Sequence, residues 1–398
     1  MSDVETLLRM FDSGRLVRPS AEAPNSVDLV RAMFSLAGGE GIEMGPGAAR
    51  IARDVADADH YVFALIDGLG MNLLGRLPED GFLRSHLAAD LQAVFPSSTA
   101  PALTALATGQ WPCIHGVPTW WVHLEESDAT AVTLPFRERY EDKPLGEVGI
   151  RREDVFPLPS IWSRIGHSLL ALVRPNIKDS IFTRYATGDG DRVGYERVGE
   201  ALQTISDRIS RAGEPTFAYL YLPDLDHICH EKGIDDDGVQ GLLLALDKEF
   251  GDFAASLDGR ARLVITADHG VVTTPEEKRF TIESGEPFLK HLRFPPTGEP
   301  SVPIFHVRPG SEQAFVGAFK RCFGDAFLLI TPDDAERLKL FGPGALSPVM
   351  RQRLGTFIGI ASQPAAVYLR LDDYQDKVHV GMHGGLTPAE MRVPLILA

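Results

Sequence analysis

The chain has 398 residues, of which 44% are hydrophobic and 24% are charged, a composition typical of a globular protein with a sizeable core. Its formal net charge of -16 argues against a nucleic-acid polymer or an anionic membrane surface as the main partner. The three cysteines are too scattered for a disulfide framework or a Cys-x-x-Cys zinc site. No stretch approaches the roughly 18 apolar residues of a membrane span. The acidic N-terminus lacks a signal-peptide pattern, so we expect a cytoplasmic protein.

Residues 1–54 are predicted to form an N-terminal helical arm. Apolar residues recur at helical spacing in Val4–Phe11 and again in Val27–Leu36. A turn-rich linker, 18–25, lies between the two patterns, and the Gly-rich stretch 38–47 is predicted to be a loop. We expect the arm to pack on the core or on a second subunit, which leaves a homo-oligomer open.

A series of apolar runs predicts strands that are buried on both faces, as in a parallel sheet. Helical patterns at Met71–Leu77, Val198–Ala212 and Gly241–Leu257 alternate with these strands. The pattern therefore predicts an α/β fold with a central, mostly parallel sheet flanked by helices. Gly68-Leu69-Gly70 does not complete a dinucleotide fingerprint, and the sequence contains no P-loop. The predicted strands are Tyr61–Ile66, Leu91–Phe95, Ser168–Val173, Thr216–Leu222 and Arg262–Thr266.

The composition changes after residue 275, where Pro-rich pieces, single basic residues and short strands run to about 361. This change predicts that residues 276–361 form an inserted cap subdomain. Residues 55–275 and 362–398 would then form the catalytic α/β core.

A polar corner at Ser97-Ser98-Thr99 follows one of the predicted strands and precedes a small apolar helix that ends at Gly109. Thr99 occupies a position suited to a helix N-cap, with Pro101 in the first turn. A helix N-terminus can hold an anion, and a hydroxyl placed there can become a nucleophile if its proton is removed. By itself, the stretch is more typical of an ordinary capped helix.

Carboxylates and imidazoles follow the buried strands, and this combination of residue types is typical of ligands for zinc or a related divalent ion. Each of these residues alone has a structural explanation, such as a helix cap or a turn. Because the ends of parallel strands meet at one edge of the sheet, we expect them to converge. With the hydroxyl of Thr99 they suit two metals, which can hold the attacking and leaving oxygens of a displacement at phosphorus. The residues are Asp67, Asp226, His230, Asp268, His269 and His383.

These segments resemble the alkaline phosphatase superfamily, and within it the type I phosphodiesterase/nucleotide pyrophosphatase branch that also contains phosphonoacetate hydrolase. The resemblance covers roughly residues 58–122, 214–275 and 365–398, and its ordered motifs are more specific for the superfamily than for a substrate. It is carried by Leu65-Ile66-Asp67-Gly68, Phe95-Pro96-Ser97-Ser98-Thr99, Ala107-Thr108-Gly109 with Pro112, His115-Gly116-Val117, Pro223–His230, Thr266–Gly270 and His383-Gly384.

The resemblance implies a role for each matching residue. Thr99 would be the nucleophile, with Ser98 as the alternative if the register shifts by one residue. One metal would be held by Asp67, Thr99, Asp268 and His269, and the second by Asp226, His230 and His383. Both metals would be Zn²⁺, with Mn²⁺ as the alternative. Asp224 and His227 match less well and would be supporting or structural residues.

Two positions depart from the branch's pattern. The branch typically has an asparagine three residues after the nucleophile, where this chain has Ala102. A second asparagine, which donates to a phosphate oxygen, would fall at Trp120. The missing donor would be replaced by the Ala100 N–H, Ser97 or a basic residue of the irregular segments. Loss of one such donor costs on the order of 10²–10³ in rate.

The sequence therefore predicts a two-metal hydrolase of phosphodiester or pyrophosphate bonds in nucleotide-like or other small phosphate esters, which acts through a covalent phospho-threonine. A phosphomonoesterase or a phosphonate hydrolase on the same site is the alternative among enzymes. A catalytically silent binding module is the alternative of another class, favoured only by Ala102 and Trp120.

Overall fold

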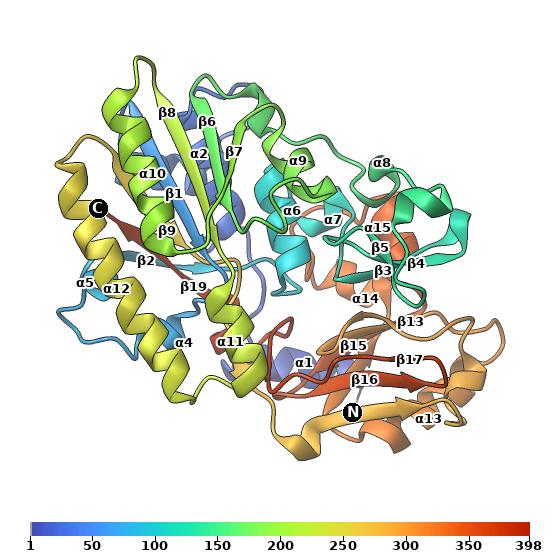
Figure 1. Cartoon of the computed structure of the whole chain (residues 1–398). Coiled ribbons are helices and arrows are strands. Elements are labelled where there is room, and N and C mark those ends of the chain that lie inside the picture. The colour runs from blue at the N-terminus through green and yellow to red at the C-terminus, as the bar shows by residue number, and fades with distance from the viewer. Residues whose placement is uncertain (1) are drawn as a thin grey trace.

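The computed structural model describes residues 2–398, which form a central α/β half and a second, mostly antiparallel half (Figure 1). The central sheet has seven strands, of which β9, β1, β8, β6 and β7 are parallel to one another, while β19 runs antiparallel between β9 and β2. The predicted α/β class with a mostly parallel sheet is confirmed. In sheet order the strands are β2 (Leu87–Gln92), β19 (Arg392–Leu397), β9 (Arg262–Thr266), β1 (His60–Ile66), β8 (Thr216–Leu222), β6 (Ser168–Val173) and β7 (Asp191–Gly194).

The register of the three central strands aligns their carboxyl ends. Ile66 of β1 pairs with Leu222 of β8, and Leu65 pairs with Thr266 of β9. These strands are apolar and buried on both faces, as expected for a parallel sheet covered by helices. The residues that follow them, from Asp67, Pro223 and Ala267 onward, therefore emerge at one edge of the sheet.

Most predicted helices are present, with shifted boundaries. The helix predicted over Gly241–Leu257 begins four residues earlier, because Asp236 accepts a hydrogen bond from the Gly238 N–H and caps it. The helix predicted over Met71–Leu77 ends already at Leu74, before Gly75. The main helices of this half are α2 (Ser26–Leu36), α3 (Pro46–Val55), α4 (Met71–Leu74), α6 (Thr99–Thr108), α9 (Ile181–Thr187), α10 (Val198–Arg211), α11 (Asp224–Lys232) and α12 (Asp237–Leu257).

The prediction of a strand over Leu91–Phe95 is wrong for the residues after Gln92. The strand β2 ends at Gln92, and the chain then leaves the sheet. Val94 and Phe95 pack instead in a separate hydrophobic cluster that joins the two halves. Pro96 has no N–H to donate to a strand neighbour. This departure from the sheet carries the hydroxyl corner toward the metal-ligand candidates.

The second half contains a seven-stranded sheet in the order β14-β15-β13-β12-β3-β4-β5 and a smaller sheet, β11-β16-β17. The range 276–361 that the sequence predicts as a cap supplies β11 to β15, whereas β3 to β5 precede it and β16 and β17 follow it. Pairing of Gly298 with Trp121 joins the early and late segments. The strands are β3 (Trp121–Leu124), β4 (Ala129–Val132), β5 (Arg137–Glu138), β11 (Arg279–Glu283), β12 (Thr297–Glu299), β13 (Val302–Phe305), β14 (Phe327–Ile330), β15 (Phe357–Ala361), β16 (Ala366–Leu371) and β17 (Tyr374–Gln375).

The N-terminal arm divides between the two halves. Its first helix, α1 (Asp3–Asp12), lies beside β14, where Asp3 accepts a 2.8 Å hydrogen bond from the Leu329 N–H. The helices α2 and α3 pack with the hydrophobic core of the central sheet. The arm thus packs on the core of its own chain, as one of the two predictions for it stated. Among residues 2–398 we find no helix with the length and apolar character needed to cross a bilayer.

Candidate active site

The predicted ligand residues come together at the carboxyl edge of the central sheet. Asp67 follows β1, and Asp268 and His269 follow β9. Asp226 and His230 lie four residues apart on α11, so they share one face of that helix. His383 follows the short strand β18 (Gly381–Met382), which pairs with β10 (Val272–Thr273). Side-chain atoms of five of these residues fall into two groups, Asp67 with Asp268 and His269, and Asp226 with His269 and His383, within 4.8 Å in each group.

The first group surrounds the hydroxyl of Thr99. His269 Nε2 lies 3.1 Å from Thr99 Oγ1. The same nitrogen lies 3.4 Å from Asp67 Oδ1 and 3.4 Å from Asp268 Oδ2. An imidazole nitrogen, a hydroxyl and two carboxylate oxygens therefore point at a common volume, a donor set that suits a divalent cation.

The second group adjoins the first. Asp226 Oδ2 lies 3.1 Å from His230 Nε2, and Asp226 Oδ1 lies 3.9 Å from His383 Nε2. The rings of His269 and His383 stack with centroids 3.8 Å apart. His269 is thus shared between the two groups, and the two cation volumes would be neighbours.

Backbone carbonyls orient two of the imidazoles. The Nδ1 of His230 lies 2.7 Å from the Gly381 carbonyl oxygen, and the Nδ1 of His269 lies 3.2 Å from the Gly270 carbonyl oxygen. A carbonyl can only accept, so each Nδ1 carries the proton in these bonds. This arrangement leaves Nε2 of both rings free to act as a ligand, as is usual for metal-binding histidines.

Burial and neighbouring charge perturb the carboxylates in opposite directions. Burial, together with the charges of Asp268 and Asp226, raises the pKa of Asp67 well above its usual range. Burial also opposes ionisation of Asp226, but the imidazoles of His230 and His383 outweigh it and hold its pKa below the usual range. Several buried acids so close together need a positive charge to offset their repulsion.

Unpartnered polar atoms show that the residues fit bound cations. Asp67 Oδ1, Asp226 Oδ1 and Asp268 Oδ2 are buried without a hydrogen-bond partner, although buried carboxylate oxygens normally have one. All three belong to the two groups described above. The oxygens that lack hydrogen bonds are therefore the ones available for coordination.

The start of α6 differs from the prediction that Thr99 is its N-cap. Ser98 is the N-cap and Thr99 is the first helical residue, because Ser98 has the extended backbone with φ -139° and ψ 153°. The Ser98 hydroxyl donates to Glu299 Oε1 at 2.5 Å and makes no capping bond. The first N–H groups of α6 therefore have no side-chain cap, and such groups are available to an anion.

Two residues of the site were missed from the sequence. Glu299 ends β12 of the second half and accepts hydrogen bonds from Ser98 Oγ and, at 2.7 Å, from the Trp120 N–H. Tyr221 lies on β8, and its hydroxyl donates to Asp67 Oδ2 at 2.5 Å. A lone glutamate in a Pro-rich segment and a tyrosine inside an apolar strand carry no local signal of these roles.

We expect Tyr221→Phe to lower zinc affinity about 10- to 100-fold, the usual effect of removing a hydrogen bond that orients a metal ligand. The hydroxyl of Tyr221 fixes Asp67 Oδ2 and so leaves Oδ1 directed at the site. Titration calorimetry with Zn²⁺ measures the change. Tyr219→Phe is the matched control, since Tyr219 lines the same pocket from the same strand. Equal effects of the two substitutions would contradict the role of the Tyr221 hydroxyl.

Glu299→Gln tests whether the buried carboxyl of Glu299 has a raised pKa. Burial raises the pKa of Glu299 to about 7, against the opposing hydrogen bonds from Ser98 and Trp120. A raised pKa means that the folded protein loses stability as the pH rises from about 4.5, the ordinary value, through 7. Urea unfolding of the metal-free proteins measures the free energy of unfolding at pH 5 and at pH 8. We expect the difference between Glu299→Gln and the wild type to change by about 2–3 kcal/mol in favour of the variant from pH 5 to pH 8.

The control for this measurement is Glu283→Gln, because Glu283 is an exposed residue of β11 in the same half. Its substitution is expected to change stability equally at the two pH values. A pH-independent effect of Glu299→Gln would show that Glu299 is ionised throughout the range.

The other sequence candidates lie apart from the two groups. Ser97 donates to the Gly385 carbonyl at 2.7 Å, so its hydroxyl is already engaged. Asp224 forms an ion pair with Arg174. His227 is largely exposed, and its Nε2 lies 3.5 Å from Glu231 Oε1. The basic residues of the irregular segment, Lys178, Arg184 and Arg192, all lie within 4.0 Å of Asp179, and none lines the pocket described next.

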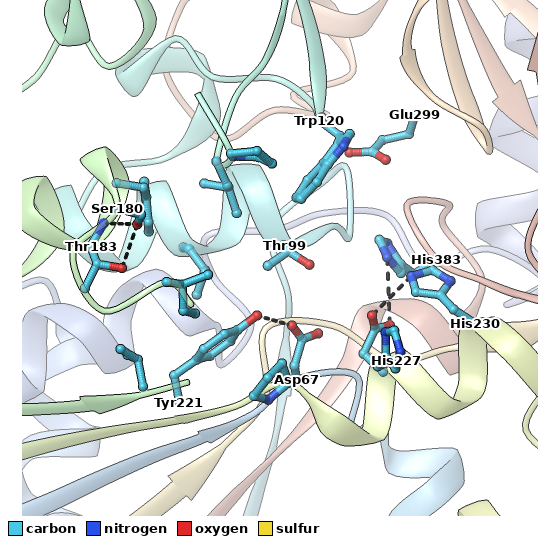
Figure 2. A pocket seen from close by; sticks show the side chains of 18 of the residues that line it. Asp67, Thr99, Trp120, Ser180, Thr183, Tyr221, His227, His230, Glu299 and His383 are labelled. Carbon is cyan, nitrogen blue, oxygen red and sulfur yellow. Dashed lines mark hydrogen bonds and ion pairs between the residues drawn. The ribbon is translucent and has the colours of Figure 1, made fainter. Parts of the chain in front are cut away.

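A cavity of about 740 Å³ opens onto Thr99 and the ligand candidates. In Figure 2, Thr99 lies at its centre, with His230 and His383 to one side and Ser180 and Thr183 of the α9 segment to the other. Glu299 and Trp120 close it from the second half of the protein, and Asp67 and Tyr221 close it from the central sheet. The cavity can hold a small molecule in contact with both the hydroxyl and the cation sites.

Comparisons with known proteins agree with this site. The sequence profile of the family "Type I phosphodiesterase / nucleotide pyrophosphatase" matches residues 61–385. Human ectonucleotide pyrophosphatase/phosphodiesterase 5 has a similar structure, with a TM-score of 0.62 and 19% identity over 85% of this chain and 87% of that chain. Murine ectonucleotide pyrophosphatase/phosphodiesterase 5 has a TM-score of 0.61 and 16% identity over 84% and 87%.

Phosphonoacetate hydrolase from Sinorhizobium meliloti 1021, solved with phosphonoacetate, has a TM-score of 0.58 and 15% identity over 85% of this chain and 89% of that chain. At these identities the structures establish a common fold. No curated protein sequence matches the chain. The profile match covers most of the chain and includes every predicted ligand and the hydroxyl corner. The protein therefore belongs to the type I phosphodiesterase/nucleotide pyrophosphatase family of the alkaline phosphatase superfamily, and it is a phosphoester hydrolase of a family in which metal dependence is typical.

Proposed function

We propose that the protein hydrolyses phosphodiester or pyrophosphate bonds of small molecules with two divalent cations and a covalent phospho-threonine. The observation that carries this proposal is the position of Thr99 Oγ1, 3.1 Å from His269 Nε2 and beside the carboxylates of Asp67 and Asp268. Next to these residues, Asp226 with His383 and with His230, whose Nε2 lies 3.1 Å from Asp226 Oδ2, would provide for a second cation.

Carboxylate and imidazole donors suit Zn²⁺, with Mn²⁺ as the alternative. Asp67, Thr99, Asp268 and His269 would hold one ion, and Asp226, His230 and His383 the other. When bound, the pair stabilises the negative charge that develops on the attacking and leaving oxygens. The hydrogen bonds from Tyr221 to Asp67 and from His230 to Gly381 keep these ligands in place.

The protein's own residues account for the two displacements. Thr99 Oγ1 gives its proton to solvent and forms a bond to phosphorus, while the bond from phosphorus to the leaving oxygen breaks and that oxygen takes up a proton from solvent. A water molecule then attacks the same phosphorus and gives one proton to solvent, while the bond from phosphorus to Thr99 Oγ1 breaks and Thr99 Oγ1 regains a proton. The uncapped N–H groups of α6 are available to the phosphate oxygens in both steps.

Thr99 suits this role better than the alternative nucleophile, Ser98. The Ser98 hydroxyl is turned toward Glu299 of the second half. The Thr99 hydroxyl is directed toward the imidazole and carboxylates of the first group. The geometry thus supports the register that the family resemblance implies.

Turnover of matched chromogenic substrates tests the proposal. The zinc-loaded protein is expected to cleave bis(p-nitrophenyl) phosphate with a kcat/KM at least about tenfold above that for p-nitrophenyl phosphate. The monoester binds as a dianion, with one more negative charge than the diester, and the residues that line the cavity include one lysine and no arginine to offset it. Faster monoester cleavage would make the protein a phosphatase, and release of phosphate from phosphonoacetate alone would make it a phosphonate hydrolase. Zinc binding without turnover of any of the three would favour a silent binding module.

We also propose that the protein acts on small molecules in the cytoplasm and not on nucleic-acid polymers or membrane surfaces. The formal net charge of -16 supports the exclusion of nucleic acids and anionic membranes, since these polyanions would be repelled. Fractionation of the source cells tests the cytoplasmic location. Recovery of the protein with the membranes or outside the cell would contradict that location.

A further inference from the structure

One half of the active-site cavity is unused by the mechanism above. Thr99, Leu103 and Leu106 are spaced by four and three residues on α6, so they share one helix face and all line the cavity. The face that presents the nucleophile therefore continues as an apolar surface away from the cation sites.

Apolar side chains from other elements complete this half of the cavity. Phe182 and Ala186 lie on α9, which contacts α6, and Val173 ends β6. Leu134 contributes from the loop between β4 and β5. We call the volume enclosed by Leu103, Leu106, Leu134, Val173, Phe182 and Ala186 the apolar slot. In Figure 2 the α9 side of the cavity, marked by Ser180 and Thr183, lies across Thr99 from the histidines.

The hydroxyl groups at the slot are already engaged within the protein. Ser180 Oγ donates to Thr183 Oγ1 at 3.0 Å, and Thr187 Oγ1 donates to the Thr183 carbonyl at 2.8 Å. The one amide at this end, Asn176, lies at the exposed rim. A ligand group in the slot would meet mainly carbon atoms.

The basic groups that line the cavity, one lysine and several imidazoles, lie at its other end. The basic side chains that line the cavity come from α11 and from residues 377–383, on the side of the cation sites. The residues that line the slot include no lysine or arginine, and Arg192 behind them already donates to Thr187 Oγ1 at 3.2 Å and to the Gly188 carbonyl at 2.8 Å. An unpaired charge placed among apolar side chains is strongly disfavoured. The slot therefore suits an uncharged group.

We propose that the apolar slot binds an uncharged alkyl or aryl substituent of the substrate, so that the preferred substrates are phosphodiesters of an apolar alcohol and not dinucleotides or nucleoside polyphosphates. This inference rests on the proposed function, because the phosphate of the same substrate lies at Thr99. Burial of the substituent would add binding energy at a distance from the reacting atoms.

A series of p-nitrophenyl diesters tests the proposal, since the leaving group stays constant while the second substituent changes. We expect kcat/KM for the hexyl ester to exceed that for the methyl ester by roughly 50-fold, because about three buried methylenes contribute about fourfold each. The p-nitrophenyl ester of thymidine 5′-phosphate is expected to be a poorer substrate than the hexyl ester. Titration calorimetry of the zinc-loaded protein with hexylphosphonate and methylphosphonate gives the same comparison without turnover.

Ala186→Phe places a ring in the slot and is expected to reduce the hexyl-to-methyl ratio to below about fivefold in both assays. Ile181→Phe is the matched control on α9, since Ile181 is 43% exposed and does not line the cavity, and it should retain the wild-type ratio. A wild-type ratio near one in both assays, or a preference for the thymidine ester, would overturn the proposal. Tighter binding of hexylphosphonate without any diester turnover would instead support the slot and refute the proposed function.

Discussion

Thr99→Ala is expected to reduce diester turnover by at least about 10³-fold, because loss of a nucleophile in covalent catalysis commonly costs this much or more. Its hydroxyl is the one directed at the imidazole of His269 and the carboxylates of the first group. Thr99→Ser, which keeps a hydroxyl at the same position, should retain more activity than Thr99→Ala. Steady-state kinetics with bis(p-nitrophenyl) phosphate measure all of these variants.

Ser98→Ala is the matched control for the nucleophile. The Ser98 hydroxyl faces Glu299, so we expect its removal to change turnover less than about tenfold, as for the loss of one neutral hydrogen bond. Acid quenching during turnover, followed by peptide mapping, should find the phosphoryl adduct on Thr99. An adduct on Ser98, or full activity of Thr99→Ala, would reject the assignment.

Removal of divalent cations is expected to abolish turnover and to destabilise the fold. Buried oxygens of Asp67, Asp226 and Asp268 lack hydrogen-bond partners, and in the metal-free protein burial and neighbouring carboxylates raise the pKa of Asp67 and of Asp268. Zinc at a thousand times its dissociation constant adds about 4 kcal/mol to the free energy of unfolding by mass action. Turnover and urea unfolding after dialysis against a chelator, with and without added Zn²⁺, measure both effects.

His230→Ala and His86→Ala separate specific from adventitious zinc. His230 belongs to the second group, whereas His86 is an exposed residue after the short helix α5 (Phe82–Ser85). Bound zinc per chain is expected to fall from two to one in His230→Ala and to remain two in His86→Ala. Turnover that persists in the chelated protein at the untreated rate would refute metal dependence.

The central sheet could be predicted because its strands are buried on both faces. Runs such as Tyr61–Ile66 and Thr216–Leu222 are continuous in apolar residues, and parallel pairing brings their ends to one edge whatever the order of the strands. Each predicted ligand except His383, which follows β18 of the small β10–β18 sheet, is at such an end or on the helix or loop that follows it. Their convergence is therefore a consequence of the class of sheet, although their roles stay predictions.

The second half could not be predicted in the same way. Its main sheet pairs Trp121 with Gly298 and Phe327 with Ala361, and such antiparallel pairs over different sequence distances leave no local pattern. Composition alone marks the change after residue 275 but not the contribution of β3 to β5. Glu299 was missed for this reason, because only the β12–β3 pairing places it beside Ser98 and Trp120.

The helix start at Thr99 shows a limit of capping rules. Ser98 and Thr99 are both favourable N-cap residues, and the sequence cannot decide between them by one position. The decision comes from Glu299, which accepts the Ser98 hydroxyl and leaves Thr99 inside the helix. Glu299 also contacts one of the two positions that depart from the branch's pattern, because it accepts a hydrogen bond from the Trp120 N–H. Ala102 is buried in the cluster that joins the two halves, and it does not line the cavity.

Diffraction from zinc-soaked crystals, measured on both sides of the zinc absorption edge, tests the two-cation site most directly. We predict two adjacent anomalous peaks, one contacted by Asp67, Thr99, Asp268 and His269 and the other by Asp226, His230 and His383. A single peak, or peaks that leave Thr99 Oγ1 outside the coordination of either ion, would contradict the proposed site.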